Sequence, residues 1–277
     1  MIDKTLKKDE RAEEPFPPQT PEASRRGKQL VRYLVFVFLF ALAATGGSLT
    51  GLLLAYQTDL PLVETLEKYQ PSIITQIFAD DGTVIAEFAI EKRVVISLNE
   101  LPDHVKQAFV AAEDNRFYSH PGIDVFGIAR AFIRNQLQGR IVGGGSTITQ
   151  QLVRAVLLDE SERTERSFRR KVREIILAAE IARTYEKSEI LELYLTEIYY
   201  GNLAYGIEAA AQTYFNKPAA ALNLAEATLL AGLPQAPALW DPYSAPDKAL
   251  GRQSEVLSLM IADGYVSVEE ARAAQDE

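Results

Sequence analysis

The chain has 277 residues, of which 47% are hydrophobic, and its net charge is −9 at neutral pH. The length suits one or two domains with a hydrophobic core, and the acidic balance argues against nucleic acid as a partner. Because the chain has no cysteine and only two histidines, His104 and His120, we exclude a disulfide framework, a thiolate metal site and a His-rich zinc site.

The N-terminal part contains one segment that is apolar enough to cross a membrane. Residues 1–32 mix charge with proline and are predicted to form a disordered cytoplasmic tail. Residues 33–56 carry no charge and are predicted to form a transmembrane helix, since they can span a hydrocarbon core of ~30 Å. A buried core helix is the alternative, and a signal peptide would have a shorter apolar region. Basic residues precede the segment and acidic residues follow it, so the positive-inside rule predicts a single-pass protein of the cytoplasmic (inner) membrane with its N-terminus inside and the catalytic part outside.

Residues 57–100 are predicted to form a membrane-proximal linker and a β-hairpin. Apolar and polar residues alternate on both sides of Asp81-Gly82, a dipeptide that favours a tight turn. We therefore expect strands at Ile73–Phe78 and Val84–Phe88, with a further short strand at Val94–Ile96.

Residues 101–277 are predicted to form one mainly helical domain with a C-terminal helical extension. The apolar period becomes helical after Leu101, and glycine and proline clusters mark the breaks between helices. The first helix is expected to end near Glu113. Further helices are predicted at Val125–Gln138, Thr147–Leu158, Glu165–Tyr185, Lys187–Ile198, Ala204–Phe215, Leu224–Ala231 and from Asp247 to the C-terminus.

The first pattern that indicates chemistry is a pair of carboxylates at the end of that first helix. Glu113 and Asp114 are followed by Phe117, His120 and Gly122 in the pattern Glu-Asp-x-x-Phe-x-x-His-x-Gly. A carboxyl group beside apolar residues can have a raised pKa, which suits a general base or acid. On spacing alone, a solvated helix end is the better interpretation.

The second pattern is a run of three glycines, residues 143–145, that leads into Ser146 and Thr147. Such a run favours a loop followed by a helix N-terminus, where free backbone N–H groups attract an anion. It lacks the lysine of a phosphate-binding P-loop. A mobile loop with an ordinary helix cap explains this pattern equally well.

The third pattern is a cluster of basic residues between Arg163 and Glu174 in an otherwise acidic region. At helical spacing, Arg170 and Lys171 share a face with Glu174. Clustered cations repel one another unless an anion binds, which favours a phosphate or an anionic lipid as ligand. A solvated helix face is the competing interpretation.

Together, in this order and spacing, the three patterns resemble the motifs of the family 51 peptidoglycan glycosyltransferases. These domains occur alone or as the first domain of class A penicillin-binding proteins. Residues 189–201 and 225–234 are similar to the family's fourth and fifth motifs. The resemblance implies a mainly α, lysozyme-like domain with a small β-hairpin at its start. The sequence departs from the family pattern at Arg154, Ala155 and Thr196, where Lys, Asn and Asn are common.

The resemblance also implies the reaction. Lipid II, a disaccharide-pentapeptide on undecaprenyl diphosphate, would be joined to a growing lipid-linked glycan through β-1,4 linkages, with inversion at the anomeric carbon and release of the lipid diphosphate. The implied partners are lipid II, the glycan, the cytoplasmic membrane and other cell-wall synthesis proteins. No organic cofactor is implied. A divalent cation, Mg²⁺ or Mn²⁺, would lie near Glu174 if the reaction uses one.

The resemblance also implies roles for the residues of this chain that match the family's functional positions. Glu113 would be the general base, with Glu174 as a second catalytic carboxylate. Arg154, Arg170 and Lys171 would neutralise the leaving diphosphate. The remaining substrate-binding positions are Asp114, Phe117, His120, Gly144, Ser146, Thr147 and Gln151.

Two other functions remain open from the sequence. A lysozyme-like enzyme that cleaves glycan also uses an acidic residue among helices, and a non-catalytic membrane scaffold would bind cell-wall precursors without turnover. The chain has no Ser-x-x-Lys or Lys-Thr-Gly pattern, so it carries no transpeptidase site of the penicillin-binding type. A complete monofunctional enzyme and the front of a bifunctional one fit the sequence equally well.

Overall fold

The computed structural model describes residues 21–57, 75–80, 84–88, 92–93, 96–139, 145–165 and 167–277. The chain divides into two compact units, Met1–Ala55 and Tyr56–Glu277.

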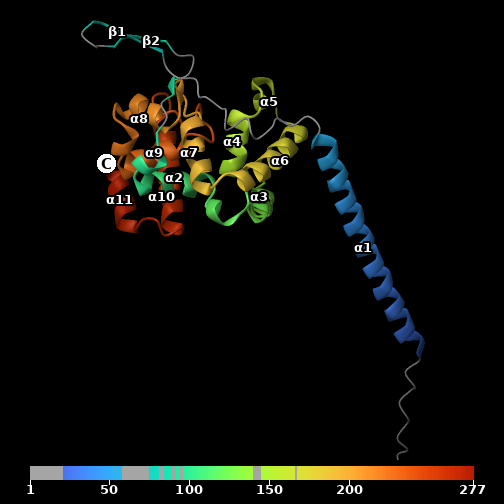
Figure 1. The fold of residues 1–277 in the computed structure, drawn as a ribbon. Coiled ribbons are helices and arrows are strands. Elements are labelled where there is room, and N and C mark those ends of the chain that lie inside the picture. Colours follow the sequence, from blue (N-terminus) through green and yellow to red (C-terminus); the bar gives the residue numbers. More distant parts are fainter. Residues whose placement is uncertain are drawn as a thin grey trace, which may run out of the picture. The chain divides into compact units, whose positions relative to one another are not determined.

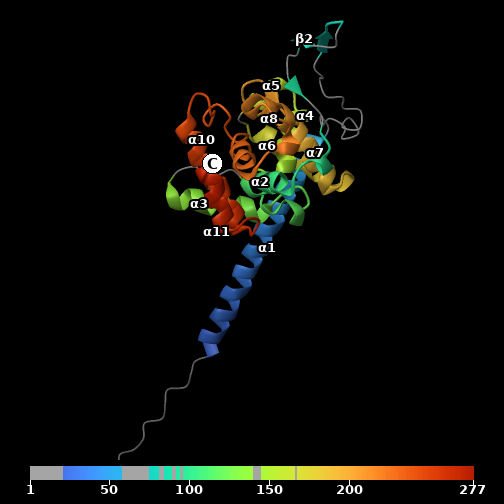
Figure 2. The ribbon, with the colours of Figure 1, turned by 90° about the vertical axis from the view of Figure 1, so that its left-hand side faces the viewer.

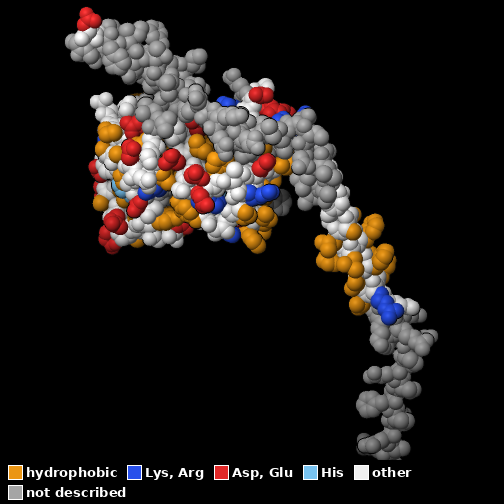
Figure 3. Space-filling model, in the orientation of Figure 1, with side chains coloured by type: hydrophobic (Ala, Val, Ile, Leu, Met, Phe, Trp, Pro, Cys, Tyr) orange, Lys and Arg blue, Asp and Glu red, His pale blue; other side chains and the backbone are white. Residues whose placement is uncertain are grey.

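The first unit contains one long helix, α1, which spans Pro21–Gln57 (Figure 1). Its stretch Gln29–Ser48 is long and apolar enough to cross a membrane, and none of it is buried. Figure 3 shows hydrophobic side chains along this stretch. Residues 21–32 are helical rather than disordered, because a proline suits the first turn of a helix and the residues that follow are mostly good helix formers. The rest of the predicted tail lies outside the described residues.

The second unit contains the predicted hairpin. Strands β1 (Thr75–Phe78) and β2 (Val84–Phe88) pair antiparallel. A short strand β3 at Lys92–Arg93 pairs in parallel with β4 at Ala204–Tyr205. Of the expected strand at Val94–Ile96, residues 94–95 lie outside the described residues, and Ile96 is a buried core residue outside any strand.

The rest of this unit is helical, which confirms the mainly α fold class. Helix α2 packs against α9 and α10, and α4 packs against α6 and α7 (Figures 1 and 2). The α-helices are α2 (Asp103–Glu113), α3 (Val125–Gln138), α4 (Ile148–Val156), α5 (Glu160–Thr164), α6 (Phe168–Thr184), α7 (Lys187–Glu197), α8 (Ile207–Phe215), α9 (Leu224–Gly232), α10 (Pro246–Ala262) and α11 (Val268–Asp276). Short 3-10 turns lie at Leu98–Glu100, Phe117–Ser119 and Ala219–Ala221.

Three of the predicted helices are divided or shortened in the structure. The expected helix Glu165–Tyr185 begins only at Phe168, where Ser167 caps it, and the unpredicted α5 precedes it. The expected C-terminal helix is broken because Gly264 has a positive φ of 77° and Ser267 starts α11 with a capping box. Residues 204–205 form β4 rather than a helix, since Gly206 separates them from α8 with a φ of 83°.

The core of this unit fixes the place of Glu113. The apolar stripe of α2 is buried at Val105, Ala108 and Phe109, so the helix cannot rotate and its last residue has one orientation. Helix α4 is likewise buried along Ile148, Leu152 and Val153. Packing of these two helices into one core brings Glu113 near Gln151.

Candidate active site

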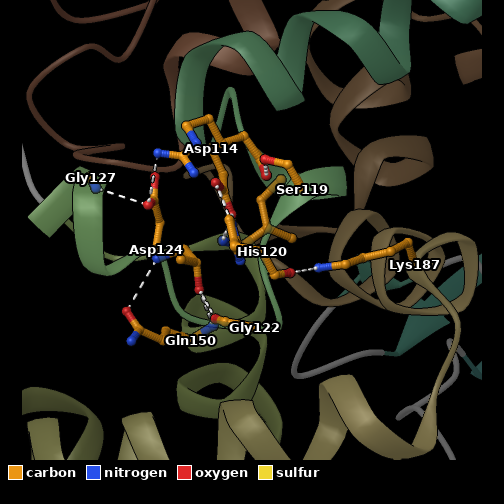
Figure 4. Close-up of polar contacts among 11 residues, drawn as sticks. Asp114, Ser119, His120, Gly122, Asp124, Gly127, Gln150 and Lys187 are labelled. Atoms are coloured by element: carbon orange, nitrogen blue, oxygen red, sulfur yellow. Dashed lines mark hydrogen bonds and ion pairs between the residues drawn. The ribbon is translucent and has the colours of Figure 1, made fainter.

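The loop after α2 is held by Asp114. Its carboxylate accepts a hydrogen bond from Nε2 of His120, at 2.9 Å to Oδ1 and 3.0 Å to Oδ2 (Figure 4). The same carboxylate accepts from the backbone N–H of Ile148 at 3.2 Å, at the start of α4, where a negative charge is favoured. Asp114 and His120 therefore join the first and second sequence patterns, and both residues are buried.

Two further contacts close this loop. Thr147 donates from its hydroxyl to the carbonyl of Gly122 at 2.6 Å, and it caps α4. A side chain at Gly122 would place its Cβ 2.4 Å from the carbonyl oxygen of Ala178, so only glycine fits there. Lys187 donates to the carbonyl of His120 at 2.8 Å (Figure 4). Its ammonium lies 4.4 Å from the ring centre of the buried Phe117.

The carboxyl group of Glu113 has two different oxygen atoms. Oε2 accepts a hydrogen bond from the side-chain amide of Gln151 at 2.6 Å. Oε1 is buried and has no hydrogen-bond partner among the described residues. Burial raises the pKa of Glu113 above its ordinary value, although Gln151, Arg252 and Arg154 oppose this shift. Glu113 is therefore a carboxylate with an increased affinity for a proton.

The cation cluster surrounds the second glutamate. Glu174 on α6 is 1% exposed, and Lys171 Nζ, Arg170 Nε and Arg154 Nε lie 2.8, 3.3 and 3.5 Å from its carboxylate oxygens. Lys171 also donates to Ser146 Oγ at 2.8 Å and to Gln150 Oε1 at 3.1 Å. Burial lowers the pKa of Lys171, and the Glu174 carboxylate opposes that shift. Three cations against one carboxylate leave this cluster with an excess of positive charge.

A cavity of about 810 Å³ lies beside Glu113, a volume within the usual range for a ligand site of roughly 300–1,000 Å³. It connects the carboxylate to the cluster, because Arg154 lines it and Ser146 binds Lys171. The predicted residues that line the cavity are Glu113, Asp114, Ser146, Thr147, Gln151 and Arg154. The predicted residues Phe117, His120, Arg170, Lys171 and Glu174 do not line it, although His120 binds Asp114, Lys171 binds Ser146 and Glu174 pairs with Arg154. Gly144 lies outside the described residues.

The cavity also has lining residues that the sequence did not single out. Arg252 on α10 is 8% exposed, lies 4.7 Å from the ring centre of Trp240 and pairs with Glu255 at 2.7 Å. From the sequence alone, Arg252 and Glu255, three positions apart on a predicted helix, would be interpreted as a surface ion pair. Only the packing of α10 against α2 turns Arg252 toward Glu113. The cavity is also lined by Tyr199, Tyr205 and Arg130. These residues are likewise brought to it by packing between segments that are distant in the sequence.

The residues around Glu174 do not fit a divalent cation. Its carboxylate is already surrounded by three positively charged side chains, which repel a metal ion. Among the residues that the structure describes, no group of three His, Cys, Asp or Glu side chains gathers to hold a metal. The divalent cation stays a prediction from the resemblance, and no chemical step is routed through it.

Comparison with known proteins gives consistent matches. Residues 81–261 match the family model described as Transglycosylase. The chain is 42% identical over 244 residues to penicillin-binding protein 1A of Aquifex aeolicus, which covers 88% of this chain and 33% of that protein. It is 40% identical over 243 residues to penicillin-binding protein 1A of Rickettsia conorii, covering 87% and 30%. This chain thus spans about a third of the length of these relatives.

Among solved structures, penicillin-binding protein 1A from Haemophilus influenzae is similar with 27% sequence identity and a TM-score of 0.43. That match covers 76% of this chain and 21% of the other.

Proposed function

We propose that this chain, which belongs to the transglycosylase family, is a peptidoglycan glycosyltransferase that polymerises lipid II into β-1,4-linked glycan. One observation carries the proposal. A carboxylate with raised proton affinity, Glu113, and a cation backed by a positive cluster, Arg154, line the same cavity. A base and a cation in one cavity suit the transfer of a sugar from a diphosphate.

The reaction requires a base because a sugar hydroxyl is a weak nucleophile at neutral pH. The 4-hydroxyl of the acceptor attacks the anomeric carbon of the donor, and Glu113 takes the hydroxyl proton as the new C–O bond forms. The bond between the anomeric carbon and the phosphate oxygen breaks, and its electron pair leaves on the lipid diphosphate. Attack from the face opposite the leaving group inverts the anomeric configuration.

The leaving diphosphate needs charge neutralisation more than protonation. Arg154 lines the cavity and is 35% exposed, so its guanidinium is available to an anion. Arg170 and Lys171 stand behind it and are oriented by Glu174, which is the role we propose for this second carboxylate. A preorganised cluster of this kind stabilises charge that develops in the transition state.

Membrane association follows from two apolar surfaces, each in its own unit. The apolar stretch of α1 would anchor the chain in the cytoplasmic membrane, with the N-terminus inside because the basic residues precede it. On α3, Phe126, Ile133 and Leu137 are 71%, 59% and 83% exposed, so they do not serve the core. We propose that this face contacts the bilayer, where both lipid-linked substrates lie.

The test is to incubate the whole chain in detergent with labelled lipid II and to measure product length, with and without a divalent cation. Long glycan supports polymerisation. Shortening of preformed glycan would instead support a lysozyme-like enzyme, and binding of lipid II without any product would support a scaffold. The Glu113→Gln variant is the control for contaminating activity.

A further inference from the structure

Arg252 is held in place at the wall of the cavity. It lies on α10, lines the cavity and is 8% exposed. Its aliphatic stem passes Gly232 at the end of α9, where an added Cβ would lie 2.8 Å from Cγ of Arg252, so a larger residue there would displace it. Its guanidinium lies 4.7 Å from the ring centre of Trp240, a cation–π contact. The stem and the guanidinium are therefore fixed before any ligand binds.

Glu255 supplies a second polar group. It lines the same cavity, and its Oε2 accepts a hydrogen bond from Nη1 of Arg252 at 2.7 Å. Its side chain is 57% exposed, so a ligand can reach the carboxylate. Arg252 can donate further bonds, since a guanidinium has five N–H donors. The pair thus offers both hydrogen-bond donors and acceptors to a ligand in the cavity.

The charge of this pair differs from that of the cluster around Glu174. Three cations lie within 3.5 Å of the Glu174 carboxylate, which leaves positive charge for an anion. Arg252 and Glu255 have opposite charges and together add no net charge to the cavity. A hydroxyl group can accept from a guanidinium and donate to a carboxylate. This pair therefore suits an uncharged ligand rich in hydroxyl groups, such as a sugar ring.

The two regions of the cavity come from different groups of packed helices. Arg154 lies on α4, which packs against α6 and α7, whereas Arg252 lies on α10, which packs against α2 and α9. Glu113, the last residue of α2, lines the cavity with both. In an inverting transfer, the acceptor attacks the face of the donor sugar opposite the leaving group. With the diphosphate at Arg154, the acceptor needs binding groups elsewhere in the cavity, and α10 supplies them.

We propose that Arg252 and Glu255 bind the acceptor sugar and that Arg252 is a specificity-determining residue of this subsite. The inference deepens the proposed function and rests on it for the direction of attack. Arg252 donates to hydroxyl oxygens other than the attacking one, Glu255 accepts from a hydroxyl group, and Trp240 keeps the guanidinium in place. The acceptor is thus oriented at Glu113 before its proton is transferred.

The test uses Trp240, the single tryptophan of the chain, as a fluorescent reporter. The probe is the neutral disaccharide of two β-1,4-linked N-acetylglucosamine units, titrated into the whole chain in detergent. We expect a saturable change in the wild type and an affinity lower by about tenfold in Arg252→Lys, which keeps the charge but loses the planar fork. Arg272→Lys, at an exposed arginine on α11, should bind like the wild type.

Three outcomes of this titration overturn the proposal: no saturable change in the wild type, an unchanged affinity in Arg252→Lys, or a response to inorganic diphosphate in place of the disaccharide. The last outcome would assign Arg252 to the anion-binding cluster. If Arg252→Lys does not fold, Glu255→Ala decides, because the side chain of Glu255 is more than half exposed. It should weaken binding severalfold, and Glu269→Ala, an exposed carboxylate on α11, is its matched control.

Turnover separates binding of the acceptor from the chemical step. With a lipid-linked glycan saturating as donor and lipid II varied as acceptor, KM for lipid II should rise about tenfold in Arg252→Lys while kcat stays within about twofold of wild type. A merely structural role would instead lower kcat, and a lower kcat with unchanged KM overturns the proposal. The fluorescence titration does not depend on catalysis. A chain that binds the disaccharide through Arg252 but makes no glycan would therefore reject the proposed function and keep the sugar site.

Discussion

Glu113 and Glu174 are the same residue type, each on a helix and each next to the cavity, yet their surroundings are opposite. Glu174 has three cations within 3.5 Å. Glu113 has one neutral amide on Oε2, and its Oε1 is buried without a hydrogen-bond partner among the described residues. The first carboxylate is fixed as a counter-ion, while the second is held in a form that accepts a proton. Neighbours, rather than residue type, separate the two roles.

The largest effect that distinguishes the two glutamates is expected when the charge of Glu113 is removed. Glu113→Gln keeps the shape of the side chain but removes the proton acceptor, so we expect polymerisation of lipid II to fall by about 10³-fold, within the range for general base catalysis. Product formation by gel analysis measures this. Glu180→Gln, an exposed carboxylate on α6, is the matched control. A Glu113→Gln variant with more than a tenth of wild-type activity would contradict the assignment.

The next effect concerns the cation that lines the cavity. Arg154→Ala should lower kcat/KM by about 10²-fold, because one preorganised donor to the leaving group is lost. Arg154→Lys keeps the charge and should retain more activity than the alanine variant. Initial rates over a range of lipid II concentrations check both. An alanine variant with wild-type kcat/KM would contradict a role for this cation, and equal losses in the two variants would show that charge alone is not sufficient.

The same substitution at the two glutamates should change stability in opposite directions. Glu174→Gln leaves the clustered cations without their counter-ion, and we expect the free energy of unfolding to fall by about 2 kcal/mol. This loss is smaller than the usual loss for a broken buried ion pair, because the cations are partly exposed. Urea unfolding of the whole chain in detergent measures this. An unchanged urea midpoint would mean that Glu174 does not organise the cluster.

Glu113→Gln should instead stabilise the protein at neutral pH, by about 1 kcal/mol or more. Burial raises the pKa of Glu113 in the folded state, so the wild type is most stable below the unfolded pKa and loses stability as pH rises through the folded pKa. Gln does not titrate. The gain should therefore be absent at acidic pH and grow toward neutral pH, and a gain independent of pH would rule out this cause.

The smallest expected effect comes from the link between the loop and the cluster. Ser146→Ala removes one of three acceptors of Lys171, and kcat/KM should fall only severalfold, since Gln150 and Glu174 still hold the ammonium. Thr184→Ala, an exposed hydroxyl at the end of α6, should have no effect on turnover.

Local sequence signals predicted much of the fold and part of the site. The apolar stripe of α2, the cap of α4 at Thr147 and the glycine at position 122 each follow from interactions within a few residues or from a backbone conformation. The patterns that contain Glu113, Gln151 and Glu174 were therefore visible in the sequence. The division of the C-terminal helix at Gly264 was missed because a glycine inside a helical pattern is often tolerated.

Other parts of the site depend on contacts between distant segments. Arg252 reaches the cavity through packing of α10, and Tyr199 and Tyr205 line it from the segment that follows α7. Their spacing in the sequence does not distinguish these residues from ordinary surface residues.

The most direct measurement compares binding and turnover of lipid II in one preparation of Glu113→Gln. Equilibrium binding should stay within about threefold of wild type, since the cations that we propose to bind the diphosphate are untouched, while the single-turnover rate should fall by about 10³-fold. Wild-type turnover by this variant would contradict a role for Glu113 as the base. Loss of binding equal to the loss of rate would place Glu113 in substrate binding and not in proton transfer.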